Sequence, residues 1–240
     1  MSPTDGLIGE AWRLYKTHWQ HLLTISFVVY ILVALIGALL TAVLTWVGAI
    51  LGAFISLVAL FWLQAALVKA VDDVRDGRAD LSLRETFAAA EQRLGPVLVA
   101  GVLAAIGIIV GLILLVVPGL ILMTLWAVII PVVVIEGRTA GESFARSREL
   151  VRGYGWSVFG VIVIVILLLI GFQIVLSLLL SPLADWLRGF VSQIISGTLT
   201  APFIAVVLTL LYFRLRDAKQ AAAAPAAEAP AVPEPPATQA

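Results

Sequence analysis

The sequence predicts an all-α protein of the polytopic membrane class, a helical bundle with six transmembrane helices arranged as three hairpins. Hydrophobic residues make up 62% of the 240 positions and charged residues only 12%, whereas soluble globular domains carry about 25% charged residues. The apolar residues gather into runs long enough to cross the ~30 Å hydrocarbon core of a bilayer, which takes about 20 residues of helix. Short turns and longer polar segments alternate between these runs, as expected for successive hairpins.

Six apolar runs are long enough to span a membrane. They occupy residues 22–46, 48–70, 97–117, 119–136, 157–181 and 190–214. Short connections that contain Gly or Pro join the members of each pair, at Trp46–Gly48, at Val117–Gly119 and around Ser181–Pro182. Because Pro and Gly interrupt helices, we expect the chain to reverse direction at these places.

Basic residues are concentrated on one side of the predicted spans. Of the fifteen Lys and Arg residues, only Arg188 lies in a hairpin turn, and the other fourteen flank the spans or lie in the long segments between pairs. Lys and Arg near the ends of membrane helices are retained in the cytoplasm. We therefore expect a multi-pass plasma membrane protein with both termini and both long segments in the cytoplasm.

An amphipathic segment precedes each hairpin, and we expect each to form a helix at the membrane interface. Apolar residues recur in these segments at helical spacing, and the second begins with a capping box, Ser82-x-x-Glu85. Every segment contains Glu, one further residue and an aromatic residue: Glu10-Ala11-Trp12, Glu85-Thr86-Phe87 and Glu142-Ser143-Phe144. The unit of an interfacial helix and a hairpin is thus predicted to occur three times.

The third amphipathic segment carries a candidate binding surface. One helical face holds Ala140, Phe144, Ser147 and Val151. Glu142 and Arg146, one turn apart on another face, are expected to pair. Basic amphipathic helices lie in the headgroup plane with their cations toward anionic phosphates, so Arg146, Arg148 and Arg152 are candidates for binding lipid headgroups, at about 1 kcal/mol each. The alternative is that these arginines only keep the segment in the cytoplasm.

The composition changes abruptly after Arg216. The following residues are rich in Ala and Pro and contain no aromatic residue, a composition that forms no packed core. We therefore divide the chain into a six-helix transmembrane domain, residues 1–216, and a disordered cytoplasmic tail, residues 217–240.

Polar residues inside the spans raise the possibility of transport. Gln64 and Gln173 are the intramembrane polar candidates, and together with Pro131 and Pro202 they could line a path for a lipid-like or small apolar solute. The alternative is that the amides hydrogen-bond between helices. The centres of the spans hold no Asp, Glu, Lys or Arg, which disfavours ion-coupled transport.

An acidic stretch at the end of the second run is the strongest indication of catalysis. Asp72, Asp73 and Asp76 could present carboxylates to Mg²⁺ bound to a lipid phosphate. Such enzymes use a second acidic cluster, which the other long segment does not supply, so a solvated helix end is the alternative. The chain has no Cys and only two His, which excludes thiol chemistry and leaves too few ligands for a metal site without carboxylates. No catalytic residue set, cofactor or nucleic-acid partner is predicted.

Residues 116–160 contain a series of short motifs. Pro118-Gly119, Trp126, Pro131 and Glu136-Gly137 are followed by Ser147–Gly153 and Trp156–Phe159. This series resembles the bacterial membrane domain found fused to glycerophosphodiester phosphodiesterases and the related YciC-like six-helix inner-membrane proteins. The resemblance implies a location in the bacterial inner membrane. It implies no hydrolysis, because the sequence has no segment that could form the catalytic phosphodiesterase domain.

From these observations we expect a non-enzymatic integral membrane protein that organises membrane lipids, anionic phospholipids in particular, or a membrane-protein partner at the cytoplasmic face. The alternatives are a transporter or channel for a lipid-like or small apolar solute, and a Mg²⁺-dependent lipid-phosphate enzyme.

Overall fold

The computed structural model describes residues 3–75 and 82–223, and all regular structure within them is helical. The helices of this described part are α1 (Leu7–Thr17), α2 (Trp19–Val74), α3 (Leu83–Glu91), α4 (Leu94–Leu114), α5 (Val116–Leu125), α6 (Ile129–Glu136), α7 (Ala140–Val151), α8 (Gly155–Leu179) and α9 (Asp185–Ala223). Five helical segments in these residues are long and apolar enough to cross a membrane: Trp19–Val74, Leu94–Leu114, Val116–Glu136, Gly155–Leu179 and Asp185–Ala222. The all-α class predicted from the sequence is therefore confirmed for the described residues, and the five long apolar helices are consistent with a membrane protein.

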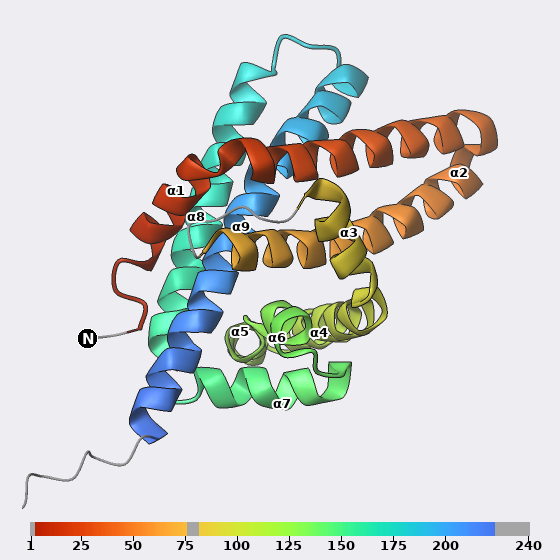
Figure 1. Cartoon of the computed structure of the whole chain (residues 1–240). Helices are drawn as coiled ribbons and strands as arrows, with labels where there is room; N and C mark the ends of the chain where they lie inside the picture. The colour runs from red at the N-terminus through yellow and green to blue at the C-terminus, as the bar shows by residue number, and fades with distance from the viewer. Residues whose placement is uncertain (1–2, 76–81, 224–240) are drawn as a thin grey trace, which may run out of the picture.

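The first two predicted spans belong to one helix that bends back on itself. The backbone of α2 leaves helical geometry at Thr45, where φ is 52° and ψ is −123°, next to the predicted turn at Trp46–Gly48. Figure 1 shows the two arms of α2 returning from this bend. The arms meet closely, since a Cβ on Gly48 would lie 1.9 Å from the carbonyl oxygen of Leu40. Glycine is therefore required at this position.

The second reversal occurs earlier than predicted. The backbone is extended at Leu115, with φ −158° and ψ 132°, which ends α4 and begins α5. The predicted turn at Val117–Gly119 lies inside α5 instead. Pro118 is in the first turn of this helix, where a backbone N–H has no partner within the helix, so the missing donor of Pro has no cost there.

Two later prolines have different effects on their helices. The predicted span 119–136 is interrupted at Trp126–Val128, between α5 and α6. Pro131 accounts for the break. Its backbone nitrogen carries no hydrogen to donate to the carbonyl of residue 127, and its ring lies too close to that carbonyl for regular helix. By contrast, α9 continues through Pro202.

The third pair of long helices ends later than predicted. Residues 180–184, which include Ser181 and Pro182, separate α8 from α9, as expected. However, α9 continues to Ala223, so residues 217–223, which were assigned to the predicted tail, belong to this helix. The remainder of the predicted tail, residues 224–240, lies outside the described residues.

The long helices diverge from a shared base. In Figure 1 the arms of α2 run across the view, α8 and α9 run from top to bottom, and α4 is seen nearly along its axis. The base is formed where the C-terminal arm of α2, α6, α7 and the C-terminal half of α9 pack together. This arrangement differs from a bundle of parallel helices.

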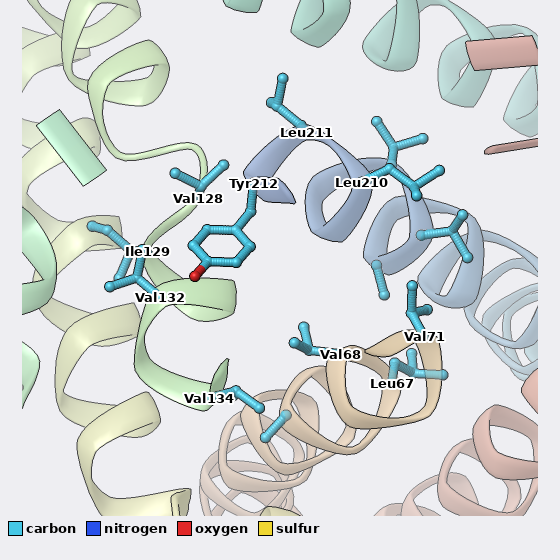
Figure 2. Packing of buried hydrophobic residues seen from close by; sticks show 14 of the residues in the cluster. Leu67, Val68, Val71, Val128, Ile129, Val132, Val134, Leu210, Leu211 and Tyr212 are labelled. Atoms are coloured by element: carbon cyan, nitrogen blue, oxygen red, sulfur yellow. The ribbon is translucent and has the colours of Figure 1, made fainter. Parts of the chain in front are cut away.

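The base is buried, whereas the far ends of the long helices are exposed. Figure 2 shows the ring of Tyr212 reaching from α9 to α6, beside Ile129 and Val132. At the far ends Trp46 is 72% exposed and Ile113 is 79% exposed. Apolar surface of this extent is unfavourable in water but is suited to lipid tails, which are as apolar as Leu.

The Glu-x-aromatic triplets take part in equivalent contacts. Each aromatic residue packs on an aromatic residue near the middle of a long helical segment. The ring centroids of these pairs lie 4.9 Å apart for Phe87–Trp62, 5.0 Å for Phe144–Trp126 and 6.2 Å for Trp12–Phe203. The partner precedes the short helix in sequence in the first two pairs, whereas Trp12 of α1 contacts the last helix, α9. The repeated units are therefore joined in a ring, with the last unit packed on the first.

Candidate functional site

A polar cluster forms at the end of α6, within the base. Gly137, at φ 68°, ends the helix and turns the chain away. The carboxylate of Glu136 accepts hydrogen bonds from the Tyr212 hydroxyl at 3.1 Å, from Nε of Arg146 at 3.0 Å and from Nε of Arg138 at 2.5 Å. The Glu136 side chain is only 15% exposed and Tyr212 is fully buried. The cluster therefore ties α6, α7 and α9 together through one carboxylate.

The polar and aromatic residues of α7 fix this helix against its neighbours. Thr139 and Glu142 form a complete capping box, and the hydrogen bonds from the backbone and side chain of Thr139 lower the pKa of Glu142. The Ser147 hydroxyl donates to the carbonyl oxygen of Leu125 at 2.8 Å. The inner face of α7 is thus covered by α4, α5 and α6. This face therefore packs on other helices of the protein, and Glu142 caps its helix instead of pairing with Arg146 as predicted.

The three candidate arginines have different environments. Arg146 pairs with Glu136 at 3.0 Å and with Glu149 at 3.0 Å, so its charge is neutralised within the protein. Arg148 and Arg152 are exposed, and neither side chain has a hydrogen bond or an ion pair with the described residues. The structure therefore separates Arg146, a packing residue, from two cations that face outward.

Lys219 adds a further cation next to Arg152. Its Nζ donates to the carbonyl oxygen of Arg152 at 2.7 Å and lies 5.8 Å from the centre of the Tyr154 ring. No carboxylate in the described residues forms an ion pair with it. We call Arg148, Arg152 and Lys219 the basic rim. Lys219 was missed as a site residue because the sequence places it in the predicted tail.

A groove lies beside the basic rim, between α5 and the start of α8. Its volume is about 650 Å³. The lining includes Val117, Ile121 and Thr124 from α5, Tyr154 just before α8, and Trp156 and Phe159 from the beginning of α8. Tyr154 therefore belongs both to the groove and to the contact with Lys219. The Trp156 side chain is 88% exposed.

The two glutamines that were predicted to lie inside the membrane have different contacts. Gln173 donates to the Ser192 hydroxyl at 3.4 Å and accepts from the Ser196 hydroxyl at 3.1 Å, so it joins α8 to α9. Gln64 lies on α2 and makes no side-chain hydrogen bond with the described residues. The contacts of Gln173 match the alternative in which amides connect helices.

The acidic candidates form no metal centre in the described part of the chain. Asp72 accepts a hydrogen bond from Nζ of Lys69 at 3.3 Å, and Asp76 lies outside the described residues. Among the residues that are described, no group of three His, Asp or Glu side chains could hold a metal ion. Asp72, whose side chain is 31% exposed, therefore pairs with a lysine of its own helix.

Sequence reasoning missed the ion pairs that join distant helices. It also missed Tyr212, which is buried and donates a hydrogen bond to Glu136. Glu10 of α1 pairs with Arg214 of α9, which also donates to the carbonyl oxygen of Asp5 at 2.6 Å. The available signal was the position of Glu136 directly after an apolar run, where a carboxylate requires a partner.

No family model matches the chain, and neither a curated protein nor a solved structure matches it.

Proposed function

We propose that this chain is a non-enzymatic integral membrane protein that binds anionic phospholipids at the cytoplasmic face of the plasma membrane. The observation that carries the proposal is the basic rim. Arg148, Arg152 and Lys219 have no carboxylate partner in the described residues, and they lie at the junction of α7, α8 and the end of α9. The location in a bacterial inner membrane, implied by the sequence resemblance, is part of the same proposal.

The proposal includes a topology of six crossings in three hairpins. The crossings are the two arms of α2, then α4, α5 with α6, α8 and α9. Exposed apolar side chains at the bend of α2 and at Leu115 support a position of the hairpin ends in lipid or at its outer surface. The Lys and Arg residues near the base support a cytoplasmic position for the base. Because the hairpins diverge, lipid borders most of each arm.

The expected selectivity follows from the number of free cations. Each Lys or Arg near an anionic bilayer surface contributes about 1 kcal/mol, so the basic rim contributes about 3 kcal/mol. This corresponds to a preference of about 100-fold for anionic over neutral lipid. The preference must fall as the salt concentration rises, because exposed charges are screened by salt.

The experiment that tests the proposal is mass spectrometry of the lipids bound to the protein in nanodiscs of phosphatidylglycerol and phosphatidylcholine. We expect phosphatidylglycerol to be enriched around the wild-type protein. The double variant Arg148→Gln/Arg152→Gln should reduce this enrichment at least fivefold. The control, Arg13→Gln/Lys16→Gln, removes the same amount of charge from exposed positions on α1. This variant should retain the enrichment of phosphatidylglycerol. A bound-lipid composition equal to that of the bulk nanodisc around the wild type would refute the proposal. If a protein partner co-purified in stoichiometric amount instead, the chain would be a scaffold.

A further inference from the structure

We infer that the groove between α5 and α8 holds one acyl chain of an anionic phospholipid whose phosphate contacts Arg152 and Lys219. The inference rests on the proposed function and assigns the bound lipid a specific place. It commits to a membrane phospholipid as the occupant.

The size and the lining of the groove suit an acyl chain. A volume of about 650 Å³ lies within the range of about 300–1,000 Å³ for ligand sites. Thr124 is the polar side chain that α5 contributes, and its hydroxyl already donates to the carbonyl oxygen of Leu120 at 2.8 Å. The wall formed by α5 therefore offers no free side-chain donor, so the part of an occupant that lies against this wall is apolar.

The groove is apolar toward the exposed end of α5 and has cations at its basal end, which matches the apolar chain and the charged headgroup of a phospholipid. On α5 the lining extends from Val117, near the exposed end of the helix, to Leu125, near the base, a distance of about 12 Å at 1.5 Å per residue. The cations lie only at the basal end, where Lys219 contacts Tyr154 and Arg152. A phospholipid with its phosphate at the base would place its acyl chain along α5, toward the middle of the bilayer.

An acyl chain fits this groove better than a peptide segment does. A peptide in the groove would bury backbone N–H and C=O groups against an apolar wall, and unpaired buried groups of this kind are costly. An acyl chain has no such groups. Its phosphate supplies the negative charge that the basic rim lacks from the protein, and Trp156 is an exposed aromatic residue suited to the interface at the basal end.

The experiment uses phosphatidylglycerol and phosphatidylcholine that carry a photoreactive diazirine in one acyl chain. The full-length protein is illuminated in nanodiscs of each lipid, and the cross-linked peptides are mapped by mass spectrometry. Phosphatidylglycerol should label the peptides that contain residues 117–125 and 153–159. Ile121→Trp, which fills the groove, should reduce this labelling at least fivefold. Ile109→Trp on α4 is the matched control, since Ile121 is 51% exposed and Ile109 is 54% exposed, and it should leave the labelling unchanged.

Three results would overturn the inference. The first is the same labelling map for Ile121→Trp and Ile109→Trp. The second is equal labelling of the groove by the two lipids, or no effect of Arg152→Gln/Lys219→Gln on the preference between them. The third is the absence of label from the groove peptides with both lipids. If phosphatidylglycerol is enriched in the nanodisc while the groove remains unlabelled, the inference fails and the proposed function stands. The absence of enrichment in the wild type refutes the proposed function itself.

Discussion

Substituting Glu136 by Gln removes the negative charge that joins α6, α7 and α9. The carboxylate accepts hydrogen bonds from Arg146 and Tyr212 with 15% of the Glu side chain exposed. A hydrogen bond to a charged group contributes about 1.5–3 kcal/mol. The contact with Arg138 adds less than about 1 kcal/mol, because the Arg138 side chain is 41% exposed. The amide of Gln can still accept a hydrogen bond from Tyr212, so we expect a total loss of about 2–3 kcal/mol.

The loss can be measured as the free energy of unfolding in mixed micelles titrated with a denaturing detergent, followed by circular dichroism. Glu149→Gln is the matched control. Glu149 bonds to the same Arg146 at 3.0 Å, but its side chain is 66% exposed, so its substitution should cost less than about 0.5 kcal/mol. The double variant Glu136→Gln/Arg146→Gln should be less destabilised than the sum of the single variants, by about 1 kcal/mol.

Equal destabilisation by Glu136→Gln and Glu149→Gln would refute this reasoning. The ion pair of Arg146 with the buried carboxylate would then contribute no more to the free energy of unfolding than its pair with the exposed carboxylate. Strict additivity in the double variant would lead to the same conclusion.

Three further predictions concern the packing and the capping of the helices. Gly48→Ala should lower the free energy of unfolding by about 1–3 kcal/mol, because the new Cβ would lie 1.9 Å from a carbonyl oxygen of the opposite arm. A Cβ on Gly37 would meet nothing within 4 Å, so Gly37→Ala should be tolerated. Equal effects of the two substitutions would contradict this prediction. Phe144→Ala should cost about 2 kcal/mol through its lost burial and ring contact, and a value near zero in the same titration would count against the aromatic pair. The pKa of Glu142 is lowered by its hydrogen bonds from Thr139, so its contribution to α7 is complete above the ordinary Glu pKa of about 4.3 and is lost as the pH falls through the lowered value. Amide exchange of α7 in the wild type and in Glu142→Gln should therefore converge toward low pH, and a difference independent of pH would exclude the capping role.

The sequence supported the prediction of the apolar helices and two of the three reversals. Length and composition suffice for this, because a long apolar segment in lipid must satisfy its backbone hydrogen bonds internally and therefore forms a helix. The exception among the reversals was Leu115. There the prediction relied on Pro118, which a helix accepts in its first turn as readily as after its end.

Contacts between distant parts of the chain could not be predicted in the same way. The Glu-x-aromatic triplet was visible in the sequence, but nothing in it indicated that Trp12 meets Phe203 and so closes the ring of repeats. Charge alone also grouped Arg146 with Arg148 and Arg152. Only the position of Glu136 relative to α7 separates the paired arginine from the free ones.

The position of the base relative to the membrane is tested most directly by cysteine accessibility. The sequence contains no Cys, so single substitutions can be labelled in intact cells with a membrane-impermeant maleimide without background. We expect Trp46→Cys, Leu115→Cys and Ser181→Cys to be labelled from outside, and Arg148→Cys to be labelled only after the membrane is permeabilised. Labelling of Arg148→Cys in intact cells, or protection of a hairpin end until permeabilisation, would contradict the proposed three hairpins with a cytoplasmic base.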